Sequence, residues 1–160
     1  MTFASGDAFC SAWVYLPDTA SDSPLPVVVM GHGLGATREL GLAPYAERFV
    51  AAGLAVLVFT YRNLGDSGGQ QRQVLSMTKQ LADWDAALDY AAGLPEVDGD
   101  RVAVWGSSLG GGHAMAVAAR HPELRAAVAQ CPFTDGLASA RALGIRKSLA
   151  LSPFVVRDSL

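Results

Sequence analysis

The sequence has 160 residues, 51% of them hydrophobic and 17% charged, so it has enough apolar material for one packed domain and too little charge for a disordered chain. Its formal net charge of -3 comes without a run of Lys or Arg, which argues against nucleic acid as a partner. No stretch approaches the roughly 18 apolar residues of a membrane span, and the first residues lack the pattern of a signal peptide. We therefore expect a cytoplasmic protein that does not bind membranes.

Short β-branched runs alternate along the chain with longer helical patterns, which predicts βαβ units and a largely parallel sheet. The first two apolar runs flank Gly6-Asp7, a turn dipeptide, so we expect the chain to open with an antiparallel hairpin. Further along, continuous apolar runs predict strands that are buried on both faces. These predicted strands are 26–30, 55–59, 102–105 and 126–130.

Apolar residues at helical spacing predict helices between these strands. Pro44 suits the first turn of the first helix, and a second helix is expected over 77–92. A third helix, from about 109 to 120, should stop at His121, because the residue before a proline is disfavoured in the α conformation. A fourth is expected over 137–151. The apolar faces of the first two helices consist of Leu42, Tyr45, Ala46, Phe49 and Val50, and of Leu81, Trp84, Leu88 and Ala91.

Two glycine-rich segments each place a serine in a setting known for nucleophiles. The first, GDSGG at 65–69, resembles the nucleophile segment of chymotrypsin-like proteases. That fold is a pair of antiparallel barrels and needs a catalytic histidine upstream, whereas the one earlier histidine, His32, lies in a glycine-rich turn after a predicted strand. The longer segment YRNLGDSGG instead resembles a loop that follows the fourth strand of many α/β-hydrolases. We therefore interpret Ser67 as a loop residue.

The second segment, GSSLG, lies directly after a predicted strand and directly before a predicted helix, which is the context of a nucleophile elbow. An elbow forces its serine to positive φ, so the residues two before and two after it must be small. Gly106 and Gly110 meet this condition for Ser108, whereas both corresponding neighbours of Ser107 are bulky. Sterics thus favour Ser108 as the catalytic nucleophile. The alternative is a tight turn in which the Ser108 hydroxyl caps the helix.

The segment GHGLG at 31–35 follows the first parallel strand and predicts the other half of the site. An elbow enzyme takes one oxyanion donor from this loop and the second from the residue after the nucleophile. The expected oxyanion hole is therefore formed by the backbone N–H groups of Leu34 and Leu109. The glycines Gly111 and Gly112 indicate a close approach of backbone to the start of the helix, since glycine there costs helix stability.

A dinucleotide-binding site is a competing interpretation of the same loop. Gly31, Gly33 and Ala36 match the glycine fingerprint of NAD-binding folds. That fingerprint requires an acidic residue at the end of the next strand, and none stands there. Arg62 leaves open an NADP-binding module, in which it would meet the 2′-phosphate, but Pro44 delays the helix that should receive the pyrophosphate.

No metal site is expected, because Cys10 and Cys131 lack the paired spacing of zinc ligands and are too few for a disulfide framework. Both are expected to be reduced core residues. The preferred interpretation needs no cofactor.

In order and spacing, the segments GHGLG, YRNLGDSGG, GSSLGGGH and QCPFTDG resemble the α/β-hydrolase superfamily. More narrowly, they resemble its X-Pro dipeptidyl-peptidase-like or dienelactone-hydrolase-like branch, with the related serine esterases and thioesterases. The resemblance implies a three-layer αβα fold with a mostly parallel, twisted sheet. It also implies that Ser108 attacks the acyl carbon of a small-molecule ester, thioester or amide, that Leu34 and Leu109 hold the oxyanion, and that His32 is structural.

One feature departs from the family pattern, in which the triad runs Ser, then Asp or Glu, then His. No histidine follows His121, which closes the helix that begins after Ser108, and His113 lies five residues beyond Ser108 on that helix. Packing and helix-end capping are the simpler roles for these two histidines. Asp135 is near an acid position that a minority of the family uses, but its carboxylate is expected to stabilise the start of the fourth helix.

We therefore expect residues 1–160 to be the N-terminal portion of a single α/β-hydrolase domain with six of the family's eight strands. The triad acid and histidine would follow Leu160, and residues 137–160 would begin a cap over the site. Without a following strand, strand 126–130 would be an exposed edge. The alternative is a non-catalytic hydrolase-like fold or an inactive fragment.

Overall fold

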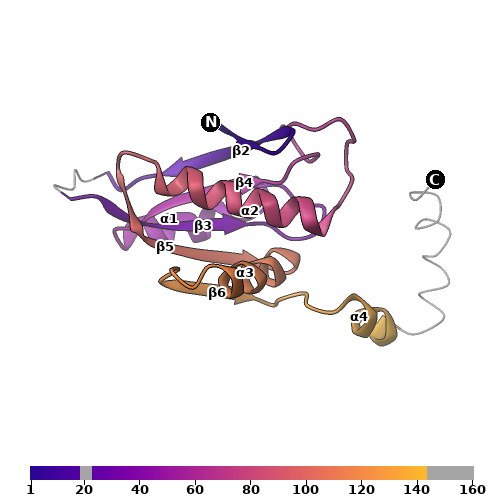
Figure 1. Ribbon diagram of the computed structural model, residues 1–160. Helices are drawn as coiled ribbons and strands as arrows, with labels where there is room; N and C mark the ends of the chain where they lie inside the picture. The colour runs from indigo at the N-terminus through magenta and orange to yellow at the C-terminus, as the bar shows by residue number, and fades with distance from the viewer. Residues whose placement is uncertain (19–22, 144–160) are drawn as a thin grey trace.

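Six strands form one mixed sheet in the computed structural model, which describes residues 1–18 and 23–143 (Figure 1). The strand order is β1-β2-β4-β3-β5-β6. The strands are β1 (Thr2–Ser5), β2 (Ala8–Tyr15), β3 (Leu25–Gly31), β4 (Ala55–Thr60), β5 (Val97–Ser107) and β6 (Ala126–Gln130). The β1–β2 and β2–β4 pairs are antiparallel, whereas β4, β3, β5 and β6 are mutually parallel. The expected opening hairpin and the largely parallel sheet are confirmed.

Four helices accompany the sheet in the described ranges: α1 (Ala43–Ala51), α2 (Met77–Ala92), α3 (Leu109–Arg120) and α4 (Gly136–Leu143). The first three match the predicted helices, and Pro44 lies in the first turn of α1 as expected. The rest of the helix expected over 137–151, with most of the expected cap, lies outside the described residues. None of the described helices is long and apolar enough to cross a bilayer.

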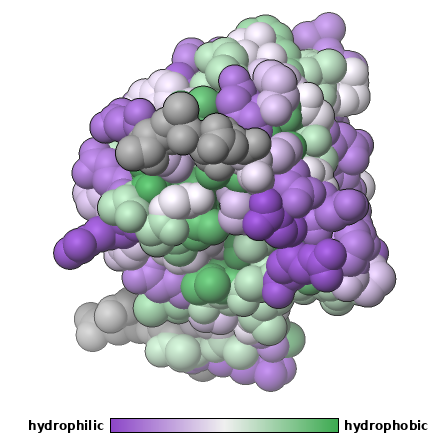
Figure 2. All heavy atoms as spheres, turned by 90° about the vertical axis from the view of Figure 1, so that its left-hand side faces the viewer, coloured by the Kyte–Doolittle hydropathy of each residue, from purple (hydrophilic) through white to green (hydrophobic). Residues whose placement is uncertain are grey.

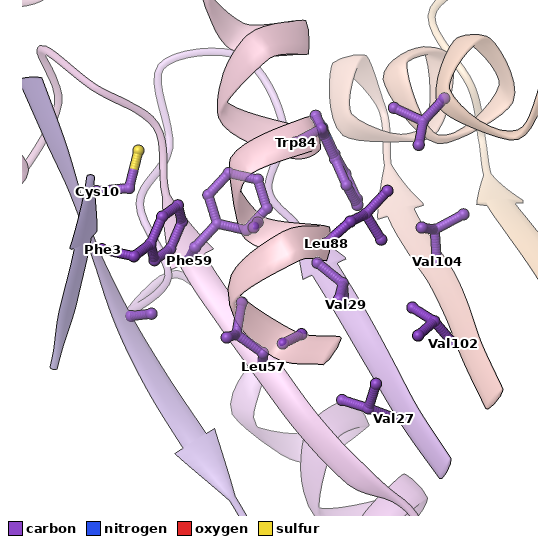
Figure 3. Packing of buried hydrophobic residues seen from close by; sticks show 14 of the residues in the cluster. Phe3, Cys10, Val27, Val29, Leu57, Phe59, Trp84, Leu88, Val102 and Val104 are labelled. Carbon is purple, nitrogen blue, oxygen red and sulfur yellow. The ribbon is translucent and has the colours of Figure 1, made fainter. Parts of the chain in front are cut away.

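Successive side chains of β3 point to opposite faces of the sheet and belong to two separate hydrophobic cores, one on each face. Val27 and Val29 pack with Trp84 of α2 and with the apolar face of α3 (Figure 3). Val28 and Met30 pack instead against α1 on the opposite face. Each fully buried side chain of this size contributes roughly 1.5–3 kcal/mol. The helices α2 and α3 therefore cover one face of the sheet and α1 covers the other, as the three-layer expectation required (Figure 1).

β6 differs from the other parallel strands because it lies at the edge of the described sheet. Residues 126–128 are exposed, and Val128 keeps 46% of its surface accessible. Burial of this strand on both faces, which its apolar run predicted, is therefore wrong for the described chain, where only β5 pairs with it. In the described sheet it is instead the exposed edge that was expected when no strand follows it. Beside its start, a hollow of about 420 Å³ is lined mostly by apolar residues of β3, β5 and β6, together with Arg101 and Arg125. Figure 2 views the molecule from the end where these strands begin, and apolar atoms reach the surface there among polar ones.

Candidate active site

The loops that follow the parallel strands meet at one edge of the sheet, because register places the last residues of these strands side by side. Gly31 at the end of β3 pairs with Gly106 of β5, and Ser107 pairs with Gln130 at the end of β6. The loop after β3 and the turn between β5 and α3 are therefore neighbours. This edge is where a doubly covered sheet offers room for a ligand.

Ser108 lies in the sharp turn between β5 and α3, with φ of 55° and ψ of -118°. Its side chain is exposed, and its hydroxyl makes no capping hydrogen bond to α3. The strand, turn and helix follow one another as an elbow requires, and the positive φ is the one expected of its central serine. The structure does not support the alternative in which this hydroxyl caps the helix.

The strained backbone of Ser108 is held by the segment that follows β6. The Ser108 N–H donates to the carbonyl oxygen of Gln130 at 2.9 Å, and the Phe133 N–H donates to the carbonyl oxygen of Ser108 at 2.9 Å. A residue at such a φ costs about 1–3 kcal/mol and persists only where its surroundings fix it. This clamp was not predicted from the sequence. Its signal was the pair Gly111 and Gly112, where a Cβ would lie 3.1 Å from the Gln130 carbonyl oxygen or overlap the Phe133 carbonyl oxygen.

The two glycines that flank Ser108 are needed for space, as expected. A Cβ on Gly106 would overlap the carbonyl oxygen of Gly110. A Cβ on Gly110 would lie 2.5 Å from the carbonyl oxygens of both Gly31 and His32. Helix α3 can therefore begin against the end of β3 only because these positions lack side chains.

The loop after β3 passes directly beside Ser108. A Cβ on Gly33 would lie 3.2 Å from Cβ and 3.7 Å from Oγ of Ser108. The next residue, Leu34, is 65% exposed, whereas the Leu109 side chain is buried. Within the described ranges, neither the Leu34 N–H nor the Leu109 N–H donates to another backbone or side-chain acceptor. Both predicted oxyanion donors thus lie on segments next to the serine.

His32 is fixed inside this loop as a neutral imidazole. Its Nδ1 lies 2.9 Å from the Gly33 carbonyl oxygen, and its Nε2 accepts from the Tyr61 N–H at 3.3 Å. The Nδ1 must therefore carry the proton. Burial lowers the pKa of His32 to about 4. With both nitrogens occupied, His32 orders the loop, which is the structural role that the resemblance implied.

The other two histidines are also engaged away from the elbow. The buried His113 contacts the side-chain oxygen of Gln80 at 2.9 Å, and burial lowers its pKa. His121 lies between the carboxylates of Asp85 and Glu123, at 3.0 and 2.8 Å. The hydrogen bond to Asp85 raises the pKa of His121. These are the packing and helix-end roles that were expected of them.

Ser67 has no free hydroxyl. Its side chain is 2% exposed, donates to the Thr60 carbonyl oxygen at 2.7 Å and accepts from the Ser11 N–H at 2.9 Å. This serine joins the end of β4 to β2, in agreement with its interpretation as a loop residue.

The NADP-binding interpretation of Arg62 finds no support in the geometry. The Arg62 side chain is buried, and its Nε donates to the carboxylate of Asp83 at 2.7 Å. A second guanidinium nitrogen donates to the Ser5 hydroxyl at 2.6 Å. These bonds occupy the group that would have to meet a phosphate.

The remaining predicted residues have structural positions. Asp135 accepts from the Ala138 N–H at 2.9 Å and so caps the start of α4, as expected. Cys10 is buried, but Cys131 is exposed, so the expectation that both are core residues is wrong for Cys131. It lies in the turn after β6, with φ of 45°. In the described part of the chain, no cluster of three or more His, Cys, Asp or Glu side chains is placed to hold a metal ion.

Comparisons with known proteins bear on the family and the fold of the chain. The family described as X-Pro dipeptidyl-peptidase (S15 family) matches residues 10–155. A relative named quorum-quenching protein AidA, from Acinetobacter baumannii, is 48% identical over 158 residues, which cover 99% of this chain and 51% of that protein. Thiohydrolase aneE from Aspergillus aculeatus is 33% identical over 110 residues, covering 69% of this chain and 35% of the relative.

Among solved structures, Est1E from Butyrivibrio proteoclasticus with bound ferulic acid superposes with a TM-score of 0.78. It is 24% identical, and the match covers 91% of this chain and 59% of that chain. The chain spans about half the length of the AidA relative and less of the thiohydrolase. The family match covers most of its residues and confirms the resemblance that the motifs indicated. The chain therefore belongs to the X-Pro dipeptidyl-peptidase (S15) family, within the α/β-hydrolase superfamily, and has the α/β-hydrolase fold.

Proposed function

We propose that this chain carries the nucleophile and the oxyanion hole of a serine hydrolase that forms an acyl-serine intermediate on Ser108. The observation that carries the proposal is the backbone of Ser108, held at φ of 55° with an exposed side chain and no capping bond. A serine with a strained backbone lowers the stability of the fold, and a serine that only capped a helix would not need this strain. Strain at a residue beside an open edge of the sheet is a feature of reactive sites.

The chemistry follows from the groups beside Ser108. Its Oγ would attack the acyl carbon, lose its proton to a general base and form a tetrahedral intermediate. The negative oxygen of that intermediate would accept hydrogen bonds from the N–H groups of Leu34 and Leu109, helped by the positive end of α3. When the intermediate collapses, the leaving group takes the proton from the base. In the second half of the reaction, water gives a proton to the base and attacks the acyl carbon, and the Ser108 Oγ then leaves and takes that proton back.

The bond that is cleaved is an ester, a thioester or an amide of a small acyl substrate. A relative named thiohydrolase supports a thioester among these, and the family name supports an amide. The exposed apolar side chain of Leu34, on the loop that passes beside the serine, suits an apolar acyl group better than a charged one. No cofactor is needed for this chemistry.

The general base and the triad acid are proposed to come from sequence that follows Leu160. All three histidines of the chain are engaged elsewhere, His32 in its loop, His113 with Gln80 and His121 with carboxylates. The chain also spans about half the length of the AidA relative, which leaves room for the later triad residues. On this proposal, residues 1–160 form the N-terminal portion of one hydrolase domain.

A fluorophosphonate probe tests the proposal. The protein that carries this chain, expressed at its full natural length, should become labelled, and peptide mapping should place the adduct on Ser108. The matched control is Ser107→Ala, which alters the adjacent serine and should still be labelled. A folded, full-length protein that never reacts would instead favour a non-catalytic hydrolase-like fold.

A further inference from the structure

The loop that carries Leu34 is bonded to the GDSGG loop, which the proposed chemistry does not use. We call residues 31–42 the oxyanion loop and residues 61–69 the GDSGG loop. The Arg38 N–H donates to the Thr60 hydroxyl at 3.1 Å. Nearby, a Cβ on Gly65 would lie 3.0 Å from the Thr37 side chain, so the two loops approach each other closely.

The strongest link between the two loops is an ion pair. Both terminal nitrogens of Arg38 donate to the Asp66 carboxylate, at 2.6 and 2.8 Å. One of them also lies 3.3 Å from the Thr60 hydroxyl, and the guanidinium stacks 4.8 Å from the ring centre of Trp13 on β2. Arg38 is only 6% exposed. A two-point bond of this kind fixes orientation as well as distance, which a single ammonium group cannot do.

Asp66 is itself anchored to the sheet. The Ser11 hydroxyl of β2 donates to the Asp66 carbonyl oxygen at 3.2 Å. The next residue, Ser67, is buried and bonded to β2 and to the end of β4. Arg38 is therefore held by a carboxylate whose backbone position is set by two strands.

The oxyanion loop has few other contacts that would fix its middle. Leu34 and Leu40 are each 65% exposed, so they contribute little packing. Its backbone bonds within the loop are short-range, such as the Ala36 N–H to the Gly33 carbonyl oxygen at 3.3 Å. His32 secures the beginning of the loop, and Arg38 secures its far side. Leu34 lies between these two anchors.

We propose that Asp66 and Arg38 are positioning residues, which hold the oxyanion loop so that the Leu34 N–H points at the developing oxyanion beside Ser108. This inference rests on the proposed function and assigns a role to GDSGG. An oxyanion donor acts mainly in the transition state, so a misplaced donor lowers kcat more than it raises KM. Removing such a donor costs about 10²–10³-fold in kcat, and loosening its loop should cost less, about 10-fold.

The test uses Asp66→Asn in the full natural-length protein. The amide keeps the size of the side chain but loses the charge and one acceptor oxygen. We expect kcat for an activated ester to fall about 10-fold while KM changes less than about twofold. Asp66→Glu, which restores the carboxylate, should recover part of the loss. The matched control is Asp98→Asn, which breaks an Arg–carboxylate pair of 2.6 Å with Arg101 at the opposite end of β5. It should leave kcat unchanged.

Amide hydrogen exchange supplies a second readout that does not depend on activity. In Asp66→Asn, exchange should accelerate in residues 33–40 and stay unchanged in α2. Unchanged exchange in the loop, or faster exchange without loss of kcat, would overturn the inference while leaving the proposed function intact. A wild-type protein that is folded but shows no turnover would refute the proposed function, and this inference with it.

Discussion

Ser67 and Ser108 lie in two glycine-rich segments of similar composition, but their surroundings are opposite. Ser67 is 2% exposed, and its hydroxyl is both donor and acceptor to backbone groups. Ser108 is exposed and strained, and its hydroxyl makes no capping bond. A hydroxyl whose hydrogen-bonding capacity is already used has little left for a substrate. The comparison indicates that a glycine setting alone does not identify a nucleophile.

Glycines have steric roles in both segments. A Cβ on Gly69 would overlap the Asn63 side chain, and one on Gly68 would enter the Phe9 ring. In the elbow, the corresponding overlaps are with the backbone of α3 and β3. The first set of contacts packs the loop against itself and against the neighbouring strand β2. The second set brings a helix N-terminus against a neighbouring strand end, and the partial positive charge of a helix N-terminus favours negative charge beside it.

Ser108→Ala should produce the largest difference between the two regions. Loss of a triad nucleophile lowers kcat by about 10⁶-fold, so hydrolysis should fall to background. Stability should change by less than about 0.5 kcal/mol, because the exposed hydroxyl has no capping bond to lose. Ester hydrolysis and urea unfolding of the full-length protein measure the two effects. If the alanine variant kept appreciable turnover, Ser108 could not be the nucleophile.

Gly110→Ala tests whether the elbow depends on close backbone approach. The new Cβ would lie 2.5 Å from two carbonyl oxygens at the end of β3, and backbone cannot give way as a flexible side chain does. Overpacking of this kind costs about 3 kcal/mol, which exceeds the gain of about 1 kcal/mol from alanine in a helix. The control is Gly93→Ala, where the nearest atom would be 3.5 Å away. Equal unfolding midpoints for the two variants would contradict the geometry of the elbow.

Ser67→Ala should show the reverse of Ser108→Ala. It leaves the Ser11 N–H and the Thr60 carbonyl oxygen without their buried partner, which costs about 2 kcal/mol of stability. Fluorophosphonate labelling per folded molecule should change far less than in Ser108→Ala. Urea unfolding and labelling of the same samples compare the two effects. If Ser67→Ala were as stable as the wild type but did not react with the probe, Ser67 would have a catalytic role.

Local patterns predicted most of the fold. Helix α2 matches its predicted range because its apolar spacing is regular and Ser76 caps its start. The elbow could be placed because strand, turn and helix are adjacent in sequence. The apolar run of β6 predicted burial on both faces, and this was wrong because β6 lies at the edge of the described sheet, where burial would need a further strand beside it. Which strands lie side by side depends on contacts between residues that are far apart in the sequence, and a local pattern does not contain this information.

The contacts that hold the site were not predictable from spacing. The clamp from Gln130 and Phe133 to Ser108 is made by backbone groups, so the sequence marks the glycines that it crowds but not the residues that form it. Arg38 and Asp66 are 28 residues apart, and no sequence rule pairs them. The sequence thus indicated which residues could react. The structure was needed to find what positions them.

The last prediction concerns His32, which connects the two serine regions. Its Nε2 accepts from the Tyr61 N–H at the start of the GDSGG loop, and Gly110 of the elbow packs against its carbonyl oxygen. Burial lowers the pKa of His32 to about 4 from its usual 6.5, so between these values the unfolded state binds more protons than the folded state. Stability should therefore be lost as the pH falls through this window, by about 2 kcal/mol from pH 7 to pH 5.

Urea unfolding at the two pH values measures this loss of stability. Glutamine does not titrate, so in His32→Gln the loss between pH 7 and pH 5 should be smaller by about 2 kcal/mol. His121→Gln serves as the control, because the raised pKa of His121 gives a contribution that is present at low pH and lost as the pH rises. Removing His121 should therefore make the acid loss larger. Identical pH dependence in wild type and His32→Gln would mean that His32 is not the buried neutral link between the regions.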